Sequence, residues 1–193
     1  PFTGEGNGNY TRTPRRHDFS IEPPKSTMLD ELVKDGKTVL AVGKIHDIFA
    51  GRGMSEFVYT SGNAEGIDRT LEYMDRDMNG LIFTNLVDYD MLYGHRRDVD
   101  GYAKALKYFD DRLPEIKARM REEDILMITA DHGCDPAYTR STDHTREYIP
   151  LIIYGKNVPP KNMGVRDTYA DIGYTVERYL GTDPGIEGTD LLT

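Results

Sequence analysis

Short apolar segments alternate with amphipathic segments along most of the chain. Four mainly apolar runs have the length of buried strands, at residues 38–43, 81–87, 125–130 and 149–154. Apolar positions at helical spacing predict helices over residues 64–74, 102–120 and 168–180. Because nearly all-apolar strands that alternate with helices are typical of sheets covered on both faces, we expect a mainly parallel α/β fold.

The residues at the ends of these segments refine the prediction. Thr27 followed by Asp30 is a capping pattern that predicts a further helix over 28–34, and Gly36 supplies its end. Pro114 is expected to jog the long helix. The connection from 131 to 148 has no helical pattern, so the strand after it is expected to run antiparallel or to lie at an edge. Residues 1–25, rich in glycine and asparagine at their start, are expected to be loop-like.

Polar residues with metal-binding or phosphate-binding chemistry follow three of the predicted strands. Lys44 follows the first strand, Asp88 and Asp90 follow the second, and Asp131-His132 follows the third. The carboxyl ends of parallel strands meet at one edge of a sheet, where open α/β sheets bind their ligands. We therefore expect these side chains to converge.

The loop after the third strand contains a second Asp-His pair, Asp143-His144, and His95 follows Asp90 by five residues. Carboxylates and imidazoles are the ligands that Zn²⁺ or Mn²⁺ accepts. The candidate ligands are Asp90, His95, Asp131, His132 and His144. Five ligands exceed the need of one tetrahedral ion and suit two ions if another part of the polypeptide supplies the rest.

The composition excludes some classes of function. Acidic residues outnumber basic ones by 33 to 24, for a net charge of −9, which argues against a nucleic-acid-binding surface but not against a phosphorylated small substrate. No apolar run reaches the length needed to span a bilayer, and we expect neither a membrane partner nor a signal peptide. The single cysteine, Cys134, cannot form an internal disulfide and suits a reducing, cytoplasmic setting.

Four segments of the sequence resemble the phosphopentomutases, a family of the alkaline phosphatase superfamily. The segments are PFTGE…YTRTPRRHDF (1–19), VGKIHDIFAGRG (42–53), NLVDYDMLYGHRRD (85–98) and TADHGCDP…TDHTREYIP (129–136, 142–150). They cover nearly the whole chain in the expected order. The resemblance implies a three-layer α/β/α core of the alkaline phosphatase type with two metal ions, usually Mn²⁺. It also implies transfer of phosphate between C1 and C5 of ribose or deoxyribose, through a phosphothreonine and a sugar bisphosphate.

The resemblance also assigns roles to residues of this chain. It implies that Asp90, His95 and His144 hold one ion and that Asp131 and His132 help to hold the other. By the same resemblance, cationic side chains bind the phosphate or ribose of the substrate, namely Lys44, Arg12 and Arg16.

One departure from the family pattern is large. The family begins with a strand bearing a further metal-binding Asp, followed by the nucleophilic Thr and an inserted cap domain, and this sequence contains none of them. We therefore expect a C-terminal portion without the nucleophile, which would lie upstream of Pro1. Residues 1–25 would be the tail of the cap domain and a linker, and residues 26–193 the later part of the catalytic core.

Structural roles are expected for the other polar residues near these motifs. Asp88 suits a helix cap or an acceptor beside the metal ligands, and Asp143 an orienting or turn-capping role. His46 is expected at the surface, His17 is expected to be structural, and Cys134 is expected to be a small buried side chain. Arg96 and Arg97 suit a solvated pair, a domain interface or substrate contacts.

Two other functions fit the same residues. One is another enzyme of the superfamily, either a phosphoglycerate mutase or a phosphatase in which water accepts the phosphoryl group. The other is a noncatalytic metal-binding or oligomerisation module, which the missing nucleophile leaves open. The segments around Lys44 and Asp90 favour the phosphopentomutase interpretation.

Overall fold

The structure is a computed structural model that describes residues 2–12 and 19–193. The core strands are β3 (Thr38–Val42), β4 (Glu56–Val58), β5 (Gly80–Thr84), β6 (Ile125–Thr129) and β7 (Leu151–Gly155). The helices are α1 (Met28–Lys34), α2 (Ile45–Ile48), α3 (Asn63–Met74), α4 (Val99–Arg119) and α5 (Ala170–Tyr179), with a π-helical turn η1 (Tyr89–Gly94). The sequence analysis predicted all of these except β4, α2 and η1, which are short.

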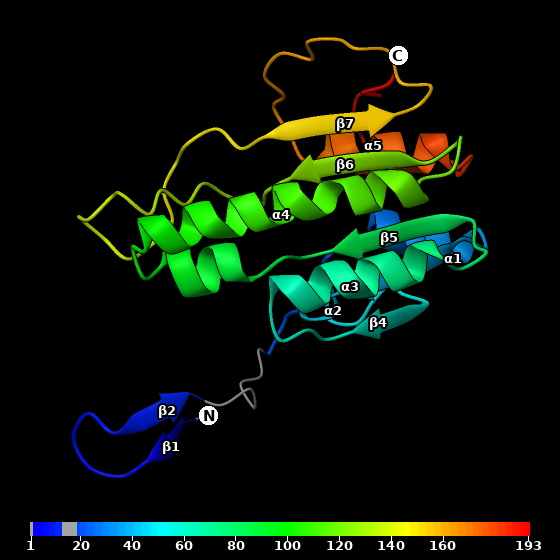
Figure 1. The fold of residues 1–193 in the computed structure, drawn as a ribbon. Helices are drawn as coiled ribbons and strands as arrows, with labels where there is room; N and C mark the ends of the chain where they lie inside the picture. The colour runs from blue at the N-terminus through cyan, green and yellow to red at the C-terminus, as the bar shows by residue number, and fades with distance from the viewer. Residues whose placement is uncertain (1, 13–18) are drawn as a thin grey trace.

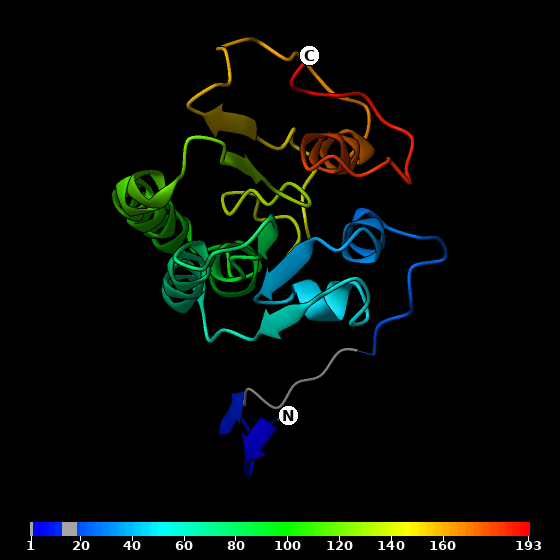
Figure 2. The same cartoon turned by 90° about the vertical axis from the view of Figure 1, so that its right-hand side faces the viewer.

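The strands form two separate hydrogen-bonded ladders. β3 lies between β4 and β5 and pairs with both in parallel. β6 pairs antiparallel with β7, which confirms the expectation drawn from the helix-free connection between them. The expectation that the strands before Lys44, Asp88 and Asp131 share one hydrogen-bonded sheet is wrong, because among the described residues β6 bonds only to β7. Figures 1 and 2 nevertheless place β6 on the β5 side of the parallel ladder, running in the direction of β5.

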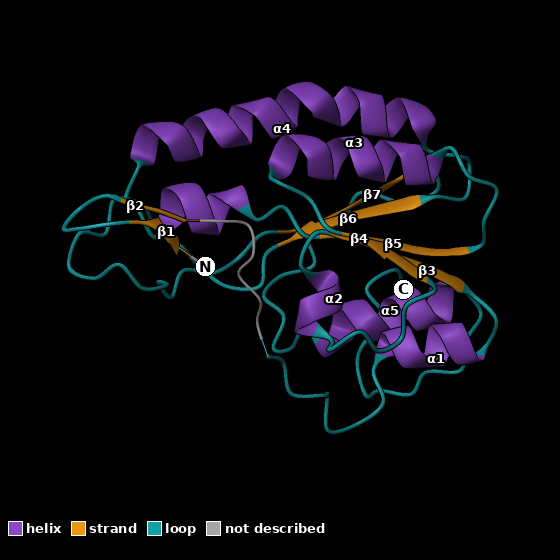
Figure 3. Ribbon diagram, turned by 90° about the horizontal axis from the view of Figure 1, so that it is seen from below, coloured by secondary structure: helices purple, strands orange, loops and turns teal. Residues whose placement is uncertain are grey.

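Helices cover both faces of the strands. Figure 3 shows α3 and α4 on one face and α1, α2 and α5 on the other. This arrangement confirms the predicted three-layer α/β/α architecture. In the described part of the chain, every helix is too short or too polar to cross a membrane.

The core is centred on β3, whose side chains alternate between the two faces. Val39 and Ala41 join a buried cluster with Leu29 and Leu32 of α1. Leu40 and Val42 point to the opposite face and join a second cluster. These four of the five β3 residues are at most 2% exposed, so this strand is the most completely buried element of the fold.

Two details of the helices bear on the sequence analysis. Thr27 caps α1: its side chain accepts a hydrogen bond from the backbone N–H of Asp30, and the Asp30 carboxylate accepts one from the backbone N–H of Thr27 at 2.8 Å. The capping-box prediction is therefore confirmed. Pro114 lies inside α4, which continues to Arg119.

The prediction that residues 1–25 are loop-like is wrong for residues 2–4 and 10–12. β1 (Phe2–Gly4) and β2 (Tyr10–Arg12) form an antiparallel hairpin. Gly6 and Gly8 adopt positive φ angles of 76° and 83° in the turn, which glycine permits without strain. The glycine and asparagine content that suggested a loop therefore belongs to a hairpin turn. The hairpin stands apart from the helices and the other strands in Figures 1 and 2.

Candidate metal centre

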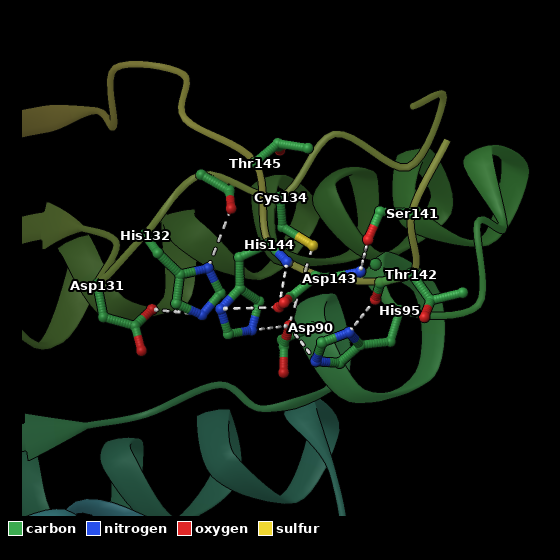
Figure 4. A network of polar contacts seen from close by, with 12 residues as sticks. Asp90, His95, Asp131, His132, Cys134, Ser141, Thr142, Asp143, His144 and Thr145 are labelled. Carbon is green, nitrogen blue, oxygen red and sulfur yellow. Dashed lines mark hydrogen bonds and ion pairs between the residues drawn. The ribbon is translucent and has the colours of Figure 1, made fainter. Parts of the chain in front are cut away.

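Two segments far apart in the sequence meet to form the site. The first segment is η1, which follows β5 and carries Asp90, together with His95 directly after it. The second is the loop after β6, residues 131–148, which carries Asp131, His132 and His144. Figure 4 shows the side chains of both segments pointing toward one another. Of the side chains expected to converge from the strand ends, those of Asp90, Asp131 and His132 lie in this cluster.

The carboxylate of Asp90 lies at the centre of the cluster. Its Oδ1 is 3.3 Å from Nε2 of His95 and 3.3 Å from Nε2 of His144. Ligand atoms of Asp90, His132 and His144 all lie within 4.8 Å of one another. This spacing is close enough for the three side chains to share one ion.

The third imidazole, that of His132, lies between His144 and the second aspartate, Asp131. The rings of His132 and His144 stack with their centroids 3.6 Å apart. Nε2 of His132 is 3.7 Å from Oδ1 of Asp131. The geometric group of three therefore joins His132 to Asp90 and His144, whereas the family resemblance assigns His132 to a second ion with Asp131.

The hydrogen bonds of the imidazoles suit metal binding. Nδ1 of His95 donates to the carbonyl of Thr142 at 2.5 Å, and Nδ1 of His132 donates to that of Gly133 at 3.1 Å. Because a carbonyl only accepts, Nδ1 carries the proton in both rings and Nε2 is left as a lone-pair donor. Histidines that bind metals are held in this way by a contact through their other ring nitrogen. These rings therefore fit a divalent ion as ligands.

Cys134 lies between the two segments without the features of a reactive thiol. Its Sγ is 3.9 Å from Oδ1 of Asp90. A side chain added to Gly94 would come within 2.4 Å of that sulfur, so only glycine lets η1 approach the loop here. Burial, followed by the charge of Asp90, raises the pKa of the Cys134 thiol. Cys134 is therefore a partly buried contact between loop and η1, close to the expected role.

The three residues assigned to substrate binding, Lys44, Arg12 and Arg16, belong to different parts of the chain. Lys44 follows β3 at the carboxyl edge of the parallel ladder, the edge from which β5 leads to Asp88 and Asp90. Gly43 makes that exit possible: its φ is 80°, and an added side chain would come within 2.4 Å of the Asn85 carbonyl. Arg12 belongs to β2, where its backbone is opposite Phe2. Arg16 and His17 lie outside the described residues.

Two of the structural roles can now be described. The Asp88 carboxylate accepts a hydrogen bond from the backbone N–H of Asn63 at 2.7 Å, at the first residue of α3, and so acts as a helix cap. His46 is less of a surface residue than expected, because its ring packs on Phe57 with 3.9 Å between centroids. Its Nδ1 lies 3.1 Å from the Tyr59 hydroxyl, and His46 is not part of the metal cluster.

Sequence reasoning missed the part that two residues, Tyr169 and Arg97, take in holding the site together. The Tyr169 hydroxyl donates to the backbone carbonyl of Asp131 at 2.6 Å, although 38 residues separate them. Arg97 contacts the loop at several carbonyls. Neither contact has a local sequence signal, because each depends on how distant segments are folded together.

Comparisons with known proteins identify the family of the chain. Residues 28–184 match the model of the metalloenzyme superfamily. All 193 residues align with the phosphopentomutases of Acetivibrio thermocellus and Lachnoclostridium phytofermentans at 58% identity, and with that of Desulfitobacterium hafniense at 54%. The chain spans 49% of the length of each of these relatives.

A solved structure shows the same fold. A phosphoglycerate mutase of Leishmania mexicana, crystallised at low cobalt concentration, superposes with a TM-score of 0.66 and 19% identity, over 84% of this chain and 38% of that one. At this identity the likeness concerns the fold. The family match covers most of the chain and includes the positions of Asp90, His132 and His144, whose side chains suit a divalent metal, and the chain therefore belongs to the metalloenzyme superfamily.

Proposed function

We propose that the chain is the metal-holding part of a phosphopentomutase, which interconverts the 1-phosphate and 5-phosphate of ribose or deoxyribose. The observation that carries the proposal is the convergence of Asp90, His132 and His144 in a chain 58% identical to phosphopentomutases over its whole length. A cytoplasmic setting, suggested by the single cysteine, belongs to the same proposal.

The chain's own residues would do three things in this reaction. Asp90, His95 and His144 would hold one Mn²⁺, while Asp131 and His132 would help to hold a second. Lys44, together with Arg12 and Arg16, would bind the phosphate or ribose of the pentose phosphate and of the sugar bisphosphate. Bound divalent ions would stabilise negative charge on the transferring phosphoryl group.

The nucleophile belongs to the part of the relatives that this chain does not span. We propose that this part contains the threonine that takes up the phosphoryl group. It would also contain the remaining metal ligand and the cap domain. Residues 1–25 would then be the tail of that cap and a linker, and residues 26–193 the later part of the core. The 193-residue chain alone is expected to show no turnover, because metal ions without the nucleophile cannot form the phosphoenzyme.

The activity is tested on a polypeptide of the relatives' full length that contains these 193 residues. With Mn²⁺ it should convert ribose 1-phosphate to ribose 5-phosphate, and the 193-residue chain should not. Conversion of 3-phosphoglycerate to 2-phosphoglycerate without action on pentose phosphates would replace the proposal with its closest rival. Release of inorganic phosphate as the main product would indicate a phosphatase, and inactivity on both substrates would indicate a noncatalytic metal-binding module.

The number of ions is tested by titrating the 193-residue chain with Mn²⁺. Three ligands for one ion against two for the other predict one site that fills well before the second. Two equally tight sites would show that the ligands are divided differently.

A further inference from the structure

Arg97 has an unusual backbone conformation two residues after His95. Its φ is 56°, and among the described residues only Ala50 shares a positive φ without being glycine. A side chain in this region is strained, and such residues persist where the surrounding structure holds them in place. The contacts of the Arg97 side chain keep its backbone in this conformation.

The guanidinium of Arg97 is fully occupied by backbone carbonyls. Nε donates to Ser141 at 2.7 Å, and Nη1 donates to Asp135 at 3.0 Å and to Gly94 at 3.2 Å. Nη2 donates to Asp143 at 2.5 Å and also to Ser141. A guanidinium has five N–H groups in a rigid fork, and these contacts use the whole fork.

Three of the four carbonyls belong to the loop that carries His144. Ser141 and Asp143 lie just before His144, and Asp135 lies near the start of the loop, next to Cys134. Arg97 therefore binds the loop at two places at once, near Asp135 and just before His144. A backbone β-bridge between Gly133 and Thr145 joins the two sides of the loop on either side of these residues. The fourth carbonyl, from Gly94, fixes the side chain to its own segment.

We propose that Arg97 is a positioning residue that docks the loop of residues 131–148 onto the segment of Asp90 and His95, and so builds the metal centre. His95 supports the docking through its contact with Thr142. A role for Arg97 in binding phosphate, or as part of a solvated pair, does not fit, because every N–H already has a carbonyl partner. The inference rests on the proposed metal centre, although the docking itself can be measured without metal.

Cys134 gives a direct probe of docking. It is the only cysteine of the chain, and it lies in the loop against Gly94. Its side chain is partly buried there. If the loop stayed docked after loss of Arg97, the thiol would stay partly buried and react at the wild-type rate. If the loop came away, the thiol would lose its burial and react faster, so the reaction rate distinguishes the two cases.

The experiment compares Arg97→Ala, Arg97→Lys and Arg96→Ala in the 193-residue chain. Arg96 is exposed, and no contact of its side chain is found among the described residues, so Arg96→Ala is a charge-matched control. The rate of thiol modification by a disulfide reagent is measured without metal, and Mn²⁺ affinity is measured by titration. Arg97→Ala should accelerate modification several-fold and weaken Mn²⁺ binding by about 10–100-fold, the usual effect of removing a residue that orients metal ligands.

The other variants separate docking from charge and from folding. Arg97→Lys keeps the charge but not the fork, so it should fall between the wild type and Arg97→Ala in both measurements. Arg96→Ala should match the wild type. If Arg97→Ala does not fold, Arg97→Lys decides the question by the same two measurements. Wild-type thiol rates in both Arg97 variants, or slower ones, would overturn the proposal. If the wild type binds no Mn²⁺, the metal centre fails as a proposal while the thiol rates still decide the docking.

Discussion

The region around β3 and the loop of residues 131–148 are held in place by different forces. β3 and α1 bury Val39, Val42, Leu29 and Leu32 completely, so apolar burial stabilises this half. The loop is mostly exposed, and its order comes from hydrogen bonds between side chains and backbone carbonyls, such as those of Arg97 and Tyr169. The metal ligands are divided between the loop and η1.

This difference separates folding from chemistry. A change in the β3 core should alter the free energy of unfolding while leaving the ligands in place in the folded fraction. A change at the metal centre should alter metal binding with little effect on unfolding. Three variants test or refine this separation, and they are ordered here by the expected size of their effect on stability.

Leu32→Ala should have the largest effect. Leu32 is fully buried in the cluster with Leu29 and Val39, so its truncation removes apolar contacts and leaves a cavity. Such truncations cost about 2–5 kcal/mol of unfolding free energy. Urea denaturation measures the loss, and Mn²⁺ titration under folding conditions should give an affinity within about threefold of the wild type. A stability loss below about 1 kcal/mol would show that burial near β3 does not dominate.

Glu177→Gln should stabilise the protein at neutral pH. Glu177 is fully buried in α5, and its Oε1 accepts a hydrogen bond from the Gly185 N–H at 3.3 Å. Its Oε2 has no hydrogen-bond partner among the described residues. Burial, and then the nearby charge of Glu31, raise the pKa of Glu177. The folded protein therefore holds the protonated form more tightly than the unfolded chain does.

The sign of the pH dependence follows from that direction. Stability linked to Glu177 is fully present below the unfolded pKa and is lost as the pH rises through the higher folded pKa. Because glutamine stays neutral, Glu177→Gln should gain about 1 kcal/mol over the wild type near pH 7–8, and less as the pH falls. Thermal midpoints from pH 4.5 to 8 measure the difference, with the exposed Glu187→Gln as control. A gain that grows toward low pH would contradict the assignment.

Ile152→Ser should have the smallest effect. Ile152 lies in β7 and is 53% exposed, so serine loses little buried surface there. We expect a change within about 0.5–1 kcal/mol. The neighbouring Ile153 is less exposed, and Ile153→Ser should cost clearly more in the same denaturation experiment. Equal losses would mean that the outer face of β7 is covered in solution.

The sequence predicted the elements whose pattern is set by local chemistry. Residues 39–42 are all apolar because β3 is covered on both faces. The capping pattern of Thr27 and Asp30 predicts the start of α1. The candidate ligands could be named because polar residues of the right type follow buried strands. Residues such as Asp131 and His132 need no knowledge of distant contacts to be selected.

The remaining features depend on how distant segments meet. Nothing near Arg97 in the sequence indicates contact with Ser141, 44 residues away. The stacking of His132 on His144 also depends on the path of the loop, and so the three ligands that lie within 4.8 Å of one another differ from the division implied by the family resemblance. The β1–β2 hairpin was missed because its glycines suit a loop as well as a turn.

Titration of the metal-free chain with Mn²⁺ tests the central claim, that η1 and the loop of residues 131–148 together form a metal centre. The proteins compared are the wild type, His144→Ala and His46→Ala. His144→Ala removes one of three converging ligands and should weaken binding by more than about tenfold, with the metal-free thermal midpoint nearly unchanged because His144 is exposed. His46→Ala should bind Mn²⁺ like the wild type. Wild-type affinity in His144→Ala, with loss of metal in His46→Ala, would contradict the account.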